Sequence, residues 1–270
     1  MTILEVPIHG QVIKCRLDLN APSQRLIFDN SQGGLLYEFP SVLALNQHLK
    51  PGDTFIDVGA HVGFFTLIAS VMVGQTGRVL AFEPEPRNAE SLRQNLALNR
   101  TQNVTLINAV AGDSEGQVTF YENLDNDGGH ALWPPGLHPF NAKTRLSPQP
   151  TMVPQVTIDQ TLRRAGLGGA SVMKIDTEGA EVRVARGARA CLSQSSLRLV
   201  ICEHNRFGLT ALGATTCELI REFYADGFKA FATEDGTNFQ EITIDDAFEP
   251  CGAWAEKFNT DRTDNIFFLR

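Results

Sequence analysis

The sequence predicts an α/β fold: a mostly parallel sheet with helices on both faces, preceded by a β-rich extension. Short apolar runs bounded by turn residues alternate with longer segments whose apolar residues recur at helical spacing. The apolar runs are nearly continuous, which is typical of parallel strands buried on both faces. The chain has 270 residues, of which 43% are hydrophobic and 20% charged. This length is ample for one substantial domain.

The extension is predicted over residues 1–35, where strand-forming stretches are separated by polar turns. Three short strands are expected, at residues 3–8, 11–17 and 25–29. Residues 41–49 then have apolar positions at helical spacing, and the helix is expected to stop at Pro51. The main domain is predicted over residues 36–270.

In the main domain, strands and helices are expected to alternate. Strands are expected at residues 54–59, 78–84, 104–113, 171–176, 197–205, 228–233 and 265–270. Helices are expected at residues 64–74, 87–99, 180–192 and 214–227. Residues 124–155 interrupt this alternation and contain six of the thirteen prolines. Because a loop of this length in a compact domain is usually functional or disordered, we interpret it as a substrate lid.

Composition limits the classes of partner. The formal net charge is −8, from 31 acidic and 23 basic residues, and no basic run indicates a nucleic-acid partner. No apolar run predicts a membrane span, and the first residues do not resemble a signal peptide. The five cysteines lack metal-binding spacing and predict reduced thiols in a cytoplasmic protein. We expect a small-molecule partner, and the sequence leaves the oligomeric state open.

The predicted core strands share polar or acidic residues at their ends. These residues are Asp57, Glu83, Asn108 or Asp113, Asp176 and Glu203. Open α/β sheets bind ligands outside the carboxyl ends of their strands. A row of carboxylates is costly there unless it meets hydrogen-bond donors or cations. Any one of them could simply cap a helix, but the whole set indicates a binding site.

The first strand-to-helix turn, DVGAHVG at residues 57–63, narrows the class of ligand. Gly59 and Gly63 let the backbone approach a ligand and a neighbouring strand. Their spacing is not the G-x-G-x-x-G of dinucleotide binding. Glu83, at the end of the next strand, could accept both hydroxyls of a ribose, and Asp57 could meet an amino group. Adenosine, an amino acid and no phosphate together describe S-adenosylmethionine.

In these residues and in the stretches around them, the sequence resembles the FkbM-type family of S-adenosylmethionine-dependent methyltransferases. The matching stretches, in the family's order, are GDTFIDVGAHVGFFTL, AFEPEPRNAESLRQNLALN, VTLINAVAGD, VTIDQTL and VMKIDTEGAEVRVARGARACL. The resemblance covers about residues 36–205. It implies the class I methyltransferase (Rossmann-like) fold, a seven-stranded sheet whose last strand is antiparallel. It also implies methyl transfer, usually to an oxygen of a sugar or another natural-product hydroxyl.

The resemblance also implies roles for individual residues around the cofactor. Asp57, Gly59 and Gly63 resemble the methionine-side loop, and Glu83 resembles the ribose ligand. Ala109 (through its backbone) and Asp113 resemble adenine-side positions. Tyr37 and Glu38 match a segment that closes over the cofactor, and His61 replaces the asparagine more common in the family. Asp176 occupies the position at which class I methyltransferases have a residue beside the reactive methyl group.

Transfer to a hydroxyl requires a general base or a metal. The candidates for the base are Asp176, Glu178, Glu203, His204 and, on the lid, His130. His130 and His138 could equally be surface histidines of a mobile loop. The metal question stays open: Asp176 with Glu203 or Asn205 would mimic the magnesium site of catechol methyltransferases.

Three further features, in the stretch KIDTEGAE (residues 174–181) and the helix after it, are expected to have a structural role. Lys174 would need a partner if buried and is expected to orient Asp176 or Glu178. Glu181 falls in the first turn of a helix, where a negative charge is favourable. The arginines that recur every three residues, Arg183, Arg186 and Arg189, are expected on a solvated helix face.

Other functional classes remain open from sequence. A nicotinamide-dependent dehydrogenase would share the architecture, although the dinucleotide fingerprint is missing. A non-catalytic nucleoside-binding module would keep the cofactor residues and dispense with the acidic ones. Among methyltransferases, the acceptor atom could also be a nitrogen or a carboxylate oxygen.

Overall fold

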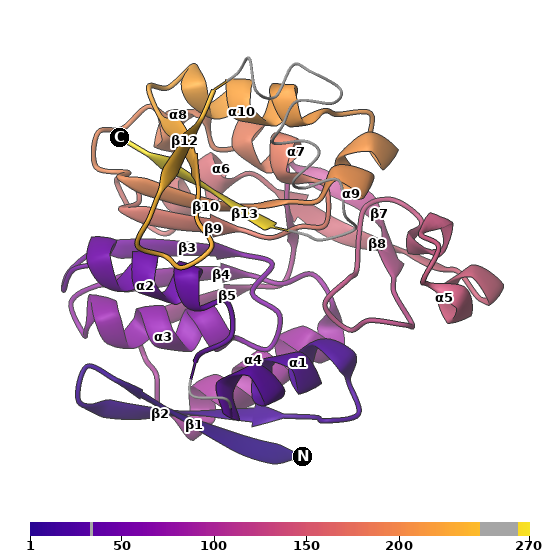
Figure 1. The fold of residues 1–270 in the computed structure, drawn as a ribbon, viewed down its shortest axis with the longest axis horizontal. Coiled ribbons are helices and arrows are strands. Elements are labelled where there is room, and N and C mark those ends of the chain that lie inside the picture. The colour runs from indigo at the N-terminus through magenta and orange to yellow at the C-terminus, as the bar shows by residue number, and fades with distance from the viewer. Residues whose placement is uncertain (33–34, 244–263) are drawn as a thin grey trace.

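The structure is a computed structural model that describes residues 1–32, 35–243 and 264–270. These residues contain a central sheet of eight strands in the order β12-β11-β13-β10-β9-β3-β4-β5 (Figure 1). The strands are β3 (Thr54–Val58), β4 (Arg78–Phe82), β5 (Val104–Ile107), β9 (Val172–Ile175), β10 (Leu199–His204), β11 (Lys229–Ala232), β12 (Gln240–Ile242) and β13 (Asp264–Leu269). Strands β10, β9, β3, β4 and β5 are parallel, whereas β13 is antiparallel to both β10 and β11.

This topology confirms the predicted class I fold, including its antiparallel last strand. The prediction of seven strands is wrong by one, because β12 adds an edge strand that pairs antiparallel with β11. The short polar segment after β11 carries no strong strand pattern, so this extension of the sheet was not evident from sequence.

Helices cover both faces of the sheet and bury a separate apolar core on each. On one face, α2 (Phe39–His48) and α3 (Phe64–Val73) pack through Leu45, Leu67 and Ile68. On the other face, the core includes residues of α6 (Ile158–Arg164), α7 (Glu181–Arg186), α8 (Arg189–Leu192) and α10 (Thr216–Tyr224). Figure 1 shows these two helix layers on opposite sides of the strands. The carboxyl ends of the parallel strands therefore lie between the layers, along one edge.

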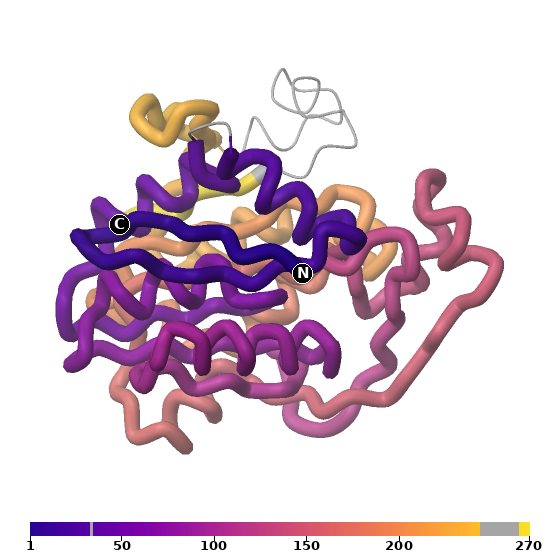
Figure 2. Tube along the Cα trace, turned by 90° about the horizontal axis from the view of Figure 1, so that it is seen from below, coloured from indigo at the N-terminus to yellow at the C-terminus, as the bar shows by residue number. Residues whose placement is uncertain are grey.

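The N-terminal hairpin, β1 (Thr2–Ile8) and β2 (Gln11–Leu17), lies against α3 and α4 (Pro86–Leu98) (Figure 2). Buried Asn95 of α4 joins the hairpin to the domain, because its Oδ1 accepts the N–H of Arg16 at 2.7 Å. Its Nδ2 also donates to the carbonyl of Val62 at 2.8 Å. The third strand expected in the extension is wrong: residues 25–29 lie inside helix α1 (Pro22–Gln32). Proline is favourable at the first helical position, which a strand pattern alone overlooks.

The segment after β5 leaves the central sheet. The predicted strand 104–113 is divided between β5 and β6 (Val110–Ala111), because β6 belongs to a second sheet of order β6-β8-β7. Its other strands are β7 (Gly116–Glu122) and β8 (Gln149–Val156). Residues 124–155 are thus not a continuous loop, since they include η1 (Pro135–Leu137), α5 (Ala142–Leu146) and most of β8. This lobe lies at one side of the domain (Figure 1).

The helix expected over residues 180–192 is two helices, α7 and α8, separated at Gly187. A Cβ at Gly187 would overlap the carbonyl of Gly112, so the chain passes too closely there for another residue. The prediction of a solvated arginine face is confirmed for Arg186 and Arg189, which are exposed, whereas Arg183 is half-buried. Both exposed arginines also form ion pairs with a neighbouring helix. Arg186 binds Glu222 of α10 at 2.9 Å, and Arg189 binds the same carboxylate. Among the described residues, no helix is long and apolar enough to cross a membrane.

Candidate active site

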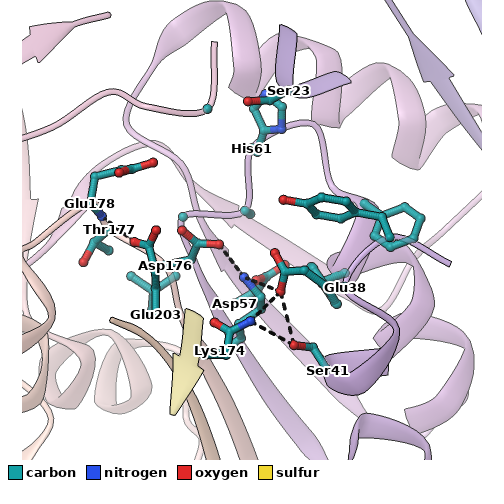
Figure 3. A pocket seen from close by; sticks show the side chains of 18 of the residues that line it. Ser23, Glu38, Ser41, Asp57, His61, Lys174, Asp176, Thr177, Glu178 and Glu203 are labelled. Atoms are coloured by element: carbon teal, nitrogen blue, oxygen red, sulfur yellow. Dashed lines mark hydrogen bonds and ion pairs between the residues drawn. The ribbon is translucent and has the colours of Figure 1, made fainter. Parts of the chain in front are cut away.

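A cavity of 1130 Å³ opens at the carboxyl edge of the parallel strands (Figure 3). Most of the residues expected at the site line it. They are Tyr37, Glu38, Asp57, Gly59, His61, Glu83, Ala109, His130, Asp176, Glu178 and Glu203. Three of the expected residues, Gly63, Asp113 and His204, do not line it.

The turn after β3 brings the backbone against the end of β9. Gly59 has a φ of +81°, and its N–H donates to the carbonyl of Phe82 at 3.0 Å. A Cβ at Gly59 would lie 2.9 Å from the carbonyl carbon of Asp176 and closer still to its oxygen. Gly63 acts differently from the prediction, because a Cβ there would overlap the side chain of Leu92. Gly59 therefore shapes the cavity, whereas Gly63 lets α3 and α4 pack.

The carboxylate of Glu83 is fixed by backbone donors. Its Oε2 accepts the N–H of His61 and its Oε1 accepts the N–H of Glu85, both at 2.8 Å. The side chain is 5% exposed, and burial raises its pKa to about 7 against the opposing effect of these bonds. The His61 ring, whose residue has a φ of +51°, lies 2.8 Å from Asp127 Oδ2. His61 thus connects Glu83 to Asp127, which lies in the segment after β7.

Asp57, at the end of β3, is 1% exposed. Its Oδ2 accepts the hydroxyl of Thr66 at 2.5 Å. Burial raises its pKa to about 6, while the nearby charge of Lys174 lowers it. Both acids expected on the cofactor side are therefore buried in the wall of one cavity and held by donors of the chain.

The adenine-side expectations are met only in part. Ala109 lines the cavity, but its N–H already donates to the carbonyl of Ile107 at 3.0 Å. Asp113 is exposed and accepts the hydroxyl of Ser114, so the structure does not bring it to the cavity. Residue 113 follows β6, which has left the central sheet, and its side chain therefore no longer belongs to the edge formed by the other strand ends.

His130 lies on the Glu83 side of the cavity. Its Nδ1 accepts the N–H of Asn123 at 2.9 Å, and its ring is 5.9 Å from that of Phe120. Burial lowers its pKa to about 4. Asp176, Glu178 and Glu203 lie together without His130, so the structure does not group it with these candidates for the base. His138 lies near Phe140 and Phe207 and does not line the cavity.

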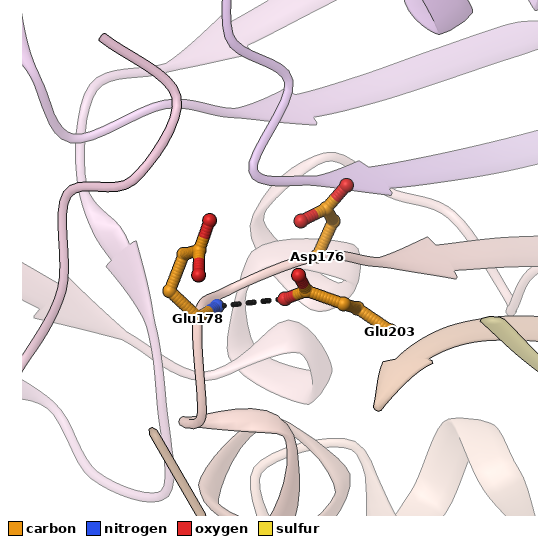
Figure 4. A group of neighbouring side chains, drawn as sticks. All are labelled: Asp176, Glu178 and Glu203. Carbon is orange, nitrogen blue, oxygen red and sulfur yellow. Dashed lines mark hydrogen bonds between the residues drawn. The ribbon is translucent and has the colours of Figure 1, made fainter. Parts of the chain in front are cut away.

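Three carboxylates meet at the ends of β9 and β10 (Figure 4). Asp176, Glu178 and Glu203 each offer an oxygen, and these atoms lie within 4.8 Å of one another. The N–H of Glu178 donates to Glu203 Oε2 at 3.0 Å. Burial raises the pKa of Glu178 to about 8 and that of Glu203 well above its ordinary value, and the neighbouring acids add to both effects. The group could accept a proton or offer oxygen ligands to a hard cation.

Asn205 is not placed to join such a metal site. Its Oδ1 accepts the N–H of Gly208 at the start of α9 (Arg206–Ala211), and its Nδ2 donates to Glu178 Oε2 at 2.5 Å. His204 is turned toward α10, where its Nε2 lies 2.7 Å from the hydroxyl of Thr216. Strand alternation explains this, because neighbouring residues Glu203 and His204 point to opposite faces of β10.

Lys174 and Glu181 have the structural partners that the sequence suggested. Lys174 is 2% exposed, and its Nζ lies 2.6 Å from Asp176 Oδ2. Burial opposes its charge, but the carboxylates of Asp176 and Glu38 outweigh burial and raise its pKa above the ordinary value. Glu181 is in the first turn of α7 and its Oε1 accepts the N–H of Gly179 at 2.9 Å.

Sequence reasoning missed several partners of the site residues. Thr66 binds Asp57, Asp127 binds His61, and Asn265 of β13 donates to Glu38 Oε2 at 2.8 Å. The spacing of Thr66, in the helix after the glycine turn, could have suggested its contact. Nothing local distinguishes Asp127 or Asn265, because each meets its partner only through the tertiary fold.

The cavity fits the parts of S-adenosylmethionine. Glu83 presents a fixed carboxylate where a ribose could bind, and Asp57 is a buried acid that could meet an amino group. Gly59 lets the turn after β3 approach the carbonyl of Asp176, which any Cβ would overlap. The three carboxylates stand beside this turn, at the ends of β9 and β10. Fold and site together define a class I S-adenosylmethionine-dependent methyltransferase.

Comparison with known proteins identifies the family. Residues 57–230 match the model of the methyltransferase FkbM domain. The chain belongs to the FkbM methyltransferase family, as its sequence motifs suggested. It is also similar to the 31-O-demethyl-FK506 methyltransferase FkbM of Streptomyces tacrolimicus, with 25% identity over 72% of this chain and 81% of that protein.

Three other curated methyltransferases are similar over only part of their length. A ribosomal protein L11 methyltransferase of Bacillus cytotoxicus is 37% identical over 28% of this chain. The matches to this protein, to an arsenite methyltransferase and to a protein-L-isoaspartate O-methyltransferase span only 22% to 35% of each relative's own length. A precorrin-6y C5,15-methyltransferase structure from Geobacter metallireducens is 14% identical over 86% of this chain and 89% of that one, with a TM-score of 0.43. None of these similarities assigns an acceptor to this chain.

Proposed function

We propose that this protein transfers the methyl group of S-adenosylmethionine to a hydroxyl oxygen of a sugar or another natural-product small molecule. The observation that carries the proposal is the meeting of Asp176, Glu178 and Glu203 within 4.8 Å at the cavity edge. A hydroxyl is a weak nucleophile unless its proton is removed during the reaction, and this group provides acceptors for that proton.

When bound, S-adenosylmethionine supplies an electrophilic methyl group on a sulfonium. The chain's contribution begins with binding. Glu83 is proposed to accept the ribose hydroxyls, and Asp57 to bind the amino group. Tyr37 lines the cavity and packs on the rings of Phe64 and Phe65, at centroid distances of 5.9 and 6.4 Å. Holding the reacting atoms in line can supply about 7–11 kcal/mol of barrier reduction.

Asp176 is the proposed general base. Its side chain is 29% exposed, so an acceptor can reach it, and its Oδ2 lies 2.6 Å from the ammonium of Lys174, which orients it. Glu178 and Glu203 are less suited to begin the reaction as bases, because burial raises their pKa values. They are proposed to orient the acceptor hydroxyl, and Glu203 is the alternative base.

Charge around the cavity favours a neutral hydroxyl over a carboxylate as the acceptor. Among the described residues that line the cavity, Lys174 is the only lysine or arginine, and it is already paired with Asp176. A carboxylate acceptor would therefore enter an acidic site without a free cation. A nitrogen acceptor remains the alternative, and it would need little help from a base.

Methyl transfer from S-adenosylmethionine labelled with ¹³C in its methyl group tests the proposal. The probes are a panel of monosaccharides, hydroxylated macrolides and hydroxylated peptides, each paired with an analogue in which the hydroxyls are blocked and with an amine analogue. The proposal predicts O-methyl signals in the carbon spectrum that disappear with blocked hydroxyls and with D176N. N-methyl signals with the amine analogues, unaffected by D176N, would contradict it.

A further inference from the structure

Lys174 is a buried ammonium shared by two carboxylates that come from distant parts of the chain. Its Nζ lies 2.6 Å from Asp176 Oδ2 and 3.9 Å from Glu38 Oε2 (Figure 3). It also lies 4.6 Å from the centroid of the Phe65 ring. Among the described residues, these are the two carboxylates within ion-pair distance of Lys174. A charge buried to this extent is strongly unfavourable without such partners.

Glu38 belongs to a segment whose conformation requires support. It has a φ of +45° and immediately precedes α2, a backbone conformation that non-glycine residues adopt at a cost. Its Oε2 accepts Asn265 Nδ2 at 2.8 Å and the hydroxyl of Ser41 at 3.2 Å, in addition to facing Lys174. The neighbouring residue, Tyr37, lines the cavity. Contacts of the Glu38 carboxylate therefore hold Tyr37 over the cavity.

We infer that Lys174 is a positioning residue that couples the Tyr37–Glu38 segment to Asp176. The Lys174 ammonium would hold the Tyr37–Glu38 segment over the cofactor site through Glu38, and it would orient Asp176 at the site of methyl transfer. This inference rests on the proposed function, since it concerns the same cavity. It goes further by making cofactor affinity depend on Asp176, a residue proposed to act on the acceptor.

The coupling follows from how one ammonium serves two anions. In the native protein, Asp176 is the nearer partner and takes most of the interaction. If Asp176 becomes an amide, Glu38 is the remaining carboxylate within ion-pair distance of Lys174, with Asp57 acting from farther away, so Glu38 is held more strongly. If both residues become amides, the ammonium loses both of these partners. Replacing Glu38 should therefore cost more cofactor affinity when Asp176 is already replaced.

A double-mutant cycle on S-adenosylhomocysteine affinity tests this, because E38Q and D176N change partly exposed residues and leave Lys174 in place. Calorimetric titration of the full chain is expected to show E38Q weakening binding by about 10-fold in the native background. In the D176N background the loss should be at least five-fold larger, a typical size for energetic coupling between sites. If E38Q lowers the affinity for S-adenosylhomocysteine by factors that agree within about two-fold in the native and D176N backgrounds, the inference is overturned.

A control cycle separates coupling from general damage. Glu85 is also a buried carboxylate near the cavity, but its side chain binds Arg87 and the N–H of Asn88, so E85Q and D176N should have additive effects. Non-additivity of the same size in the control cycle would also contradict a specific role for Lys174. The unsubstituted protein distinguishes the two proposals. If it fails to bind S-adenosylhomocysteine, the proposed function fails, whereas binding with additive effects of E38Q and D176N refutes the coupling alone.

Discussion

Replacing Gly59 by alanine tests whether activity depends on the close approach between the turn after β3 and the backbone of Asp176. Gly59 has a φ of +81°, so alanine costs about 1–2 kcal/mol in backbone strain. The new Cβ would also lie 2.9 Å from the carbonyl carbon of Asp176. Because carbon atoms pack best at about 3.5–4.0 Å, and the Asp176 oxygen is closer still, the end of β9 must move by about 1 Å.

A displacement of that size at the reacting centre can cost about 100-fold in rate. We therefore expect G59A to lower kcat/KM at least about 100-fold, equivalent to about 2.7 kcal/mol of transition-state stabilisation. Its affinity for S-adenosylhomocysteine should fall as well. Gly74 is the matched control: its φ is +66° and a Cβ there meets nothing within 4 Å. Strain alone should thus destabilise G74A, as measured by urea unfolding, without changing turnover. Equal turnover in G59A and G74A would refute the reasoning.

Three further predictions concern individual carboxylates. In the native protein each carboxylate oxygen of Glu83 accepts a backbone N–H, so in E83Q the amide N–H₂ must face one of these N–H groups. Affinity of E83Q for S-adenosylhomocysteine should fall about 5- to 150-fold. The control variant E90Q, at an exposed position, should leave this affinity unchanged. Burial raises the pKa of Glu178 from 4.5 to about 8, so its neutral form stabilises the fold at low pH and this contribution is lost as pH rises through that range. The unfolding free energy of the unliganded protein should therefore fall across this range, and E178Q should reduce the fall; an unchanged slope contradicts the assignment. E222Q, which removes the shared carboxylate of Arg186 and Arg189, should cost about 1–3 kcal/mol in urea unfolding, and a loss below 0.5 kcal/mol would mean that the pairs contribute little.

The sequence was most informative where local pattern and tertiary structure agree. The strands near Asp57, Glu83, Asp176 and Glu203 were predictable, because continuous apolar runs that end in polar residues indicate buried strands. Their side chains meet at one edge for a topological reason, since parallel strands present their carboxyl ends together. Most of the acidic part of the site could thus be assigned before the structure was known.

Other features depend on contacts between distant residues. Glu38 and Asn265 are separated by 227 positions, and His61 and Asp127 by 66, so no periodicity connects them. Helix α1 was missed because its consecutive apolar residues, Leu26, Ile27 and Phe28, resemble a strand in isolation, although only Ile27 of the three is buried in the core. Asp113 was misplaced because the strand pattern of residues 104–113 continues across the point where the chain changes sheets.

The proposed site can be tested most directly by the structure of the protein bound to S-adenosylhomocysteine. We expect the ribose hydroxyls at the carboxylate of Glu83 and the amino group toward Asp57. We also expect the sulfur to face the edge formed by Asp176, Glu178 and Glu203. A ligand bound outside this cavity, or one whose sulfur faces away from the three carboxylates, would contradict it.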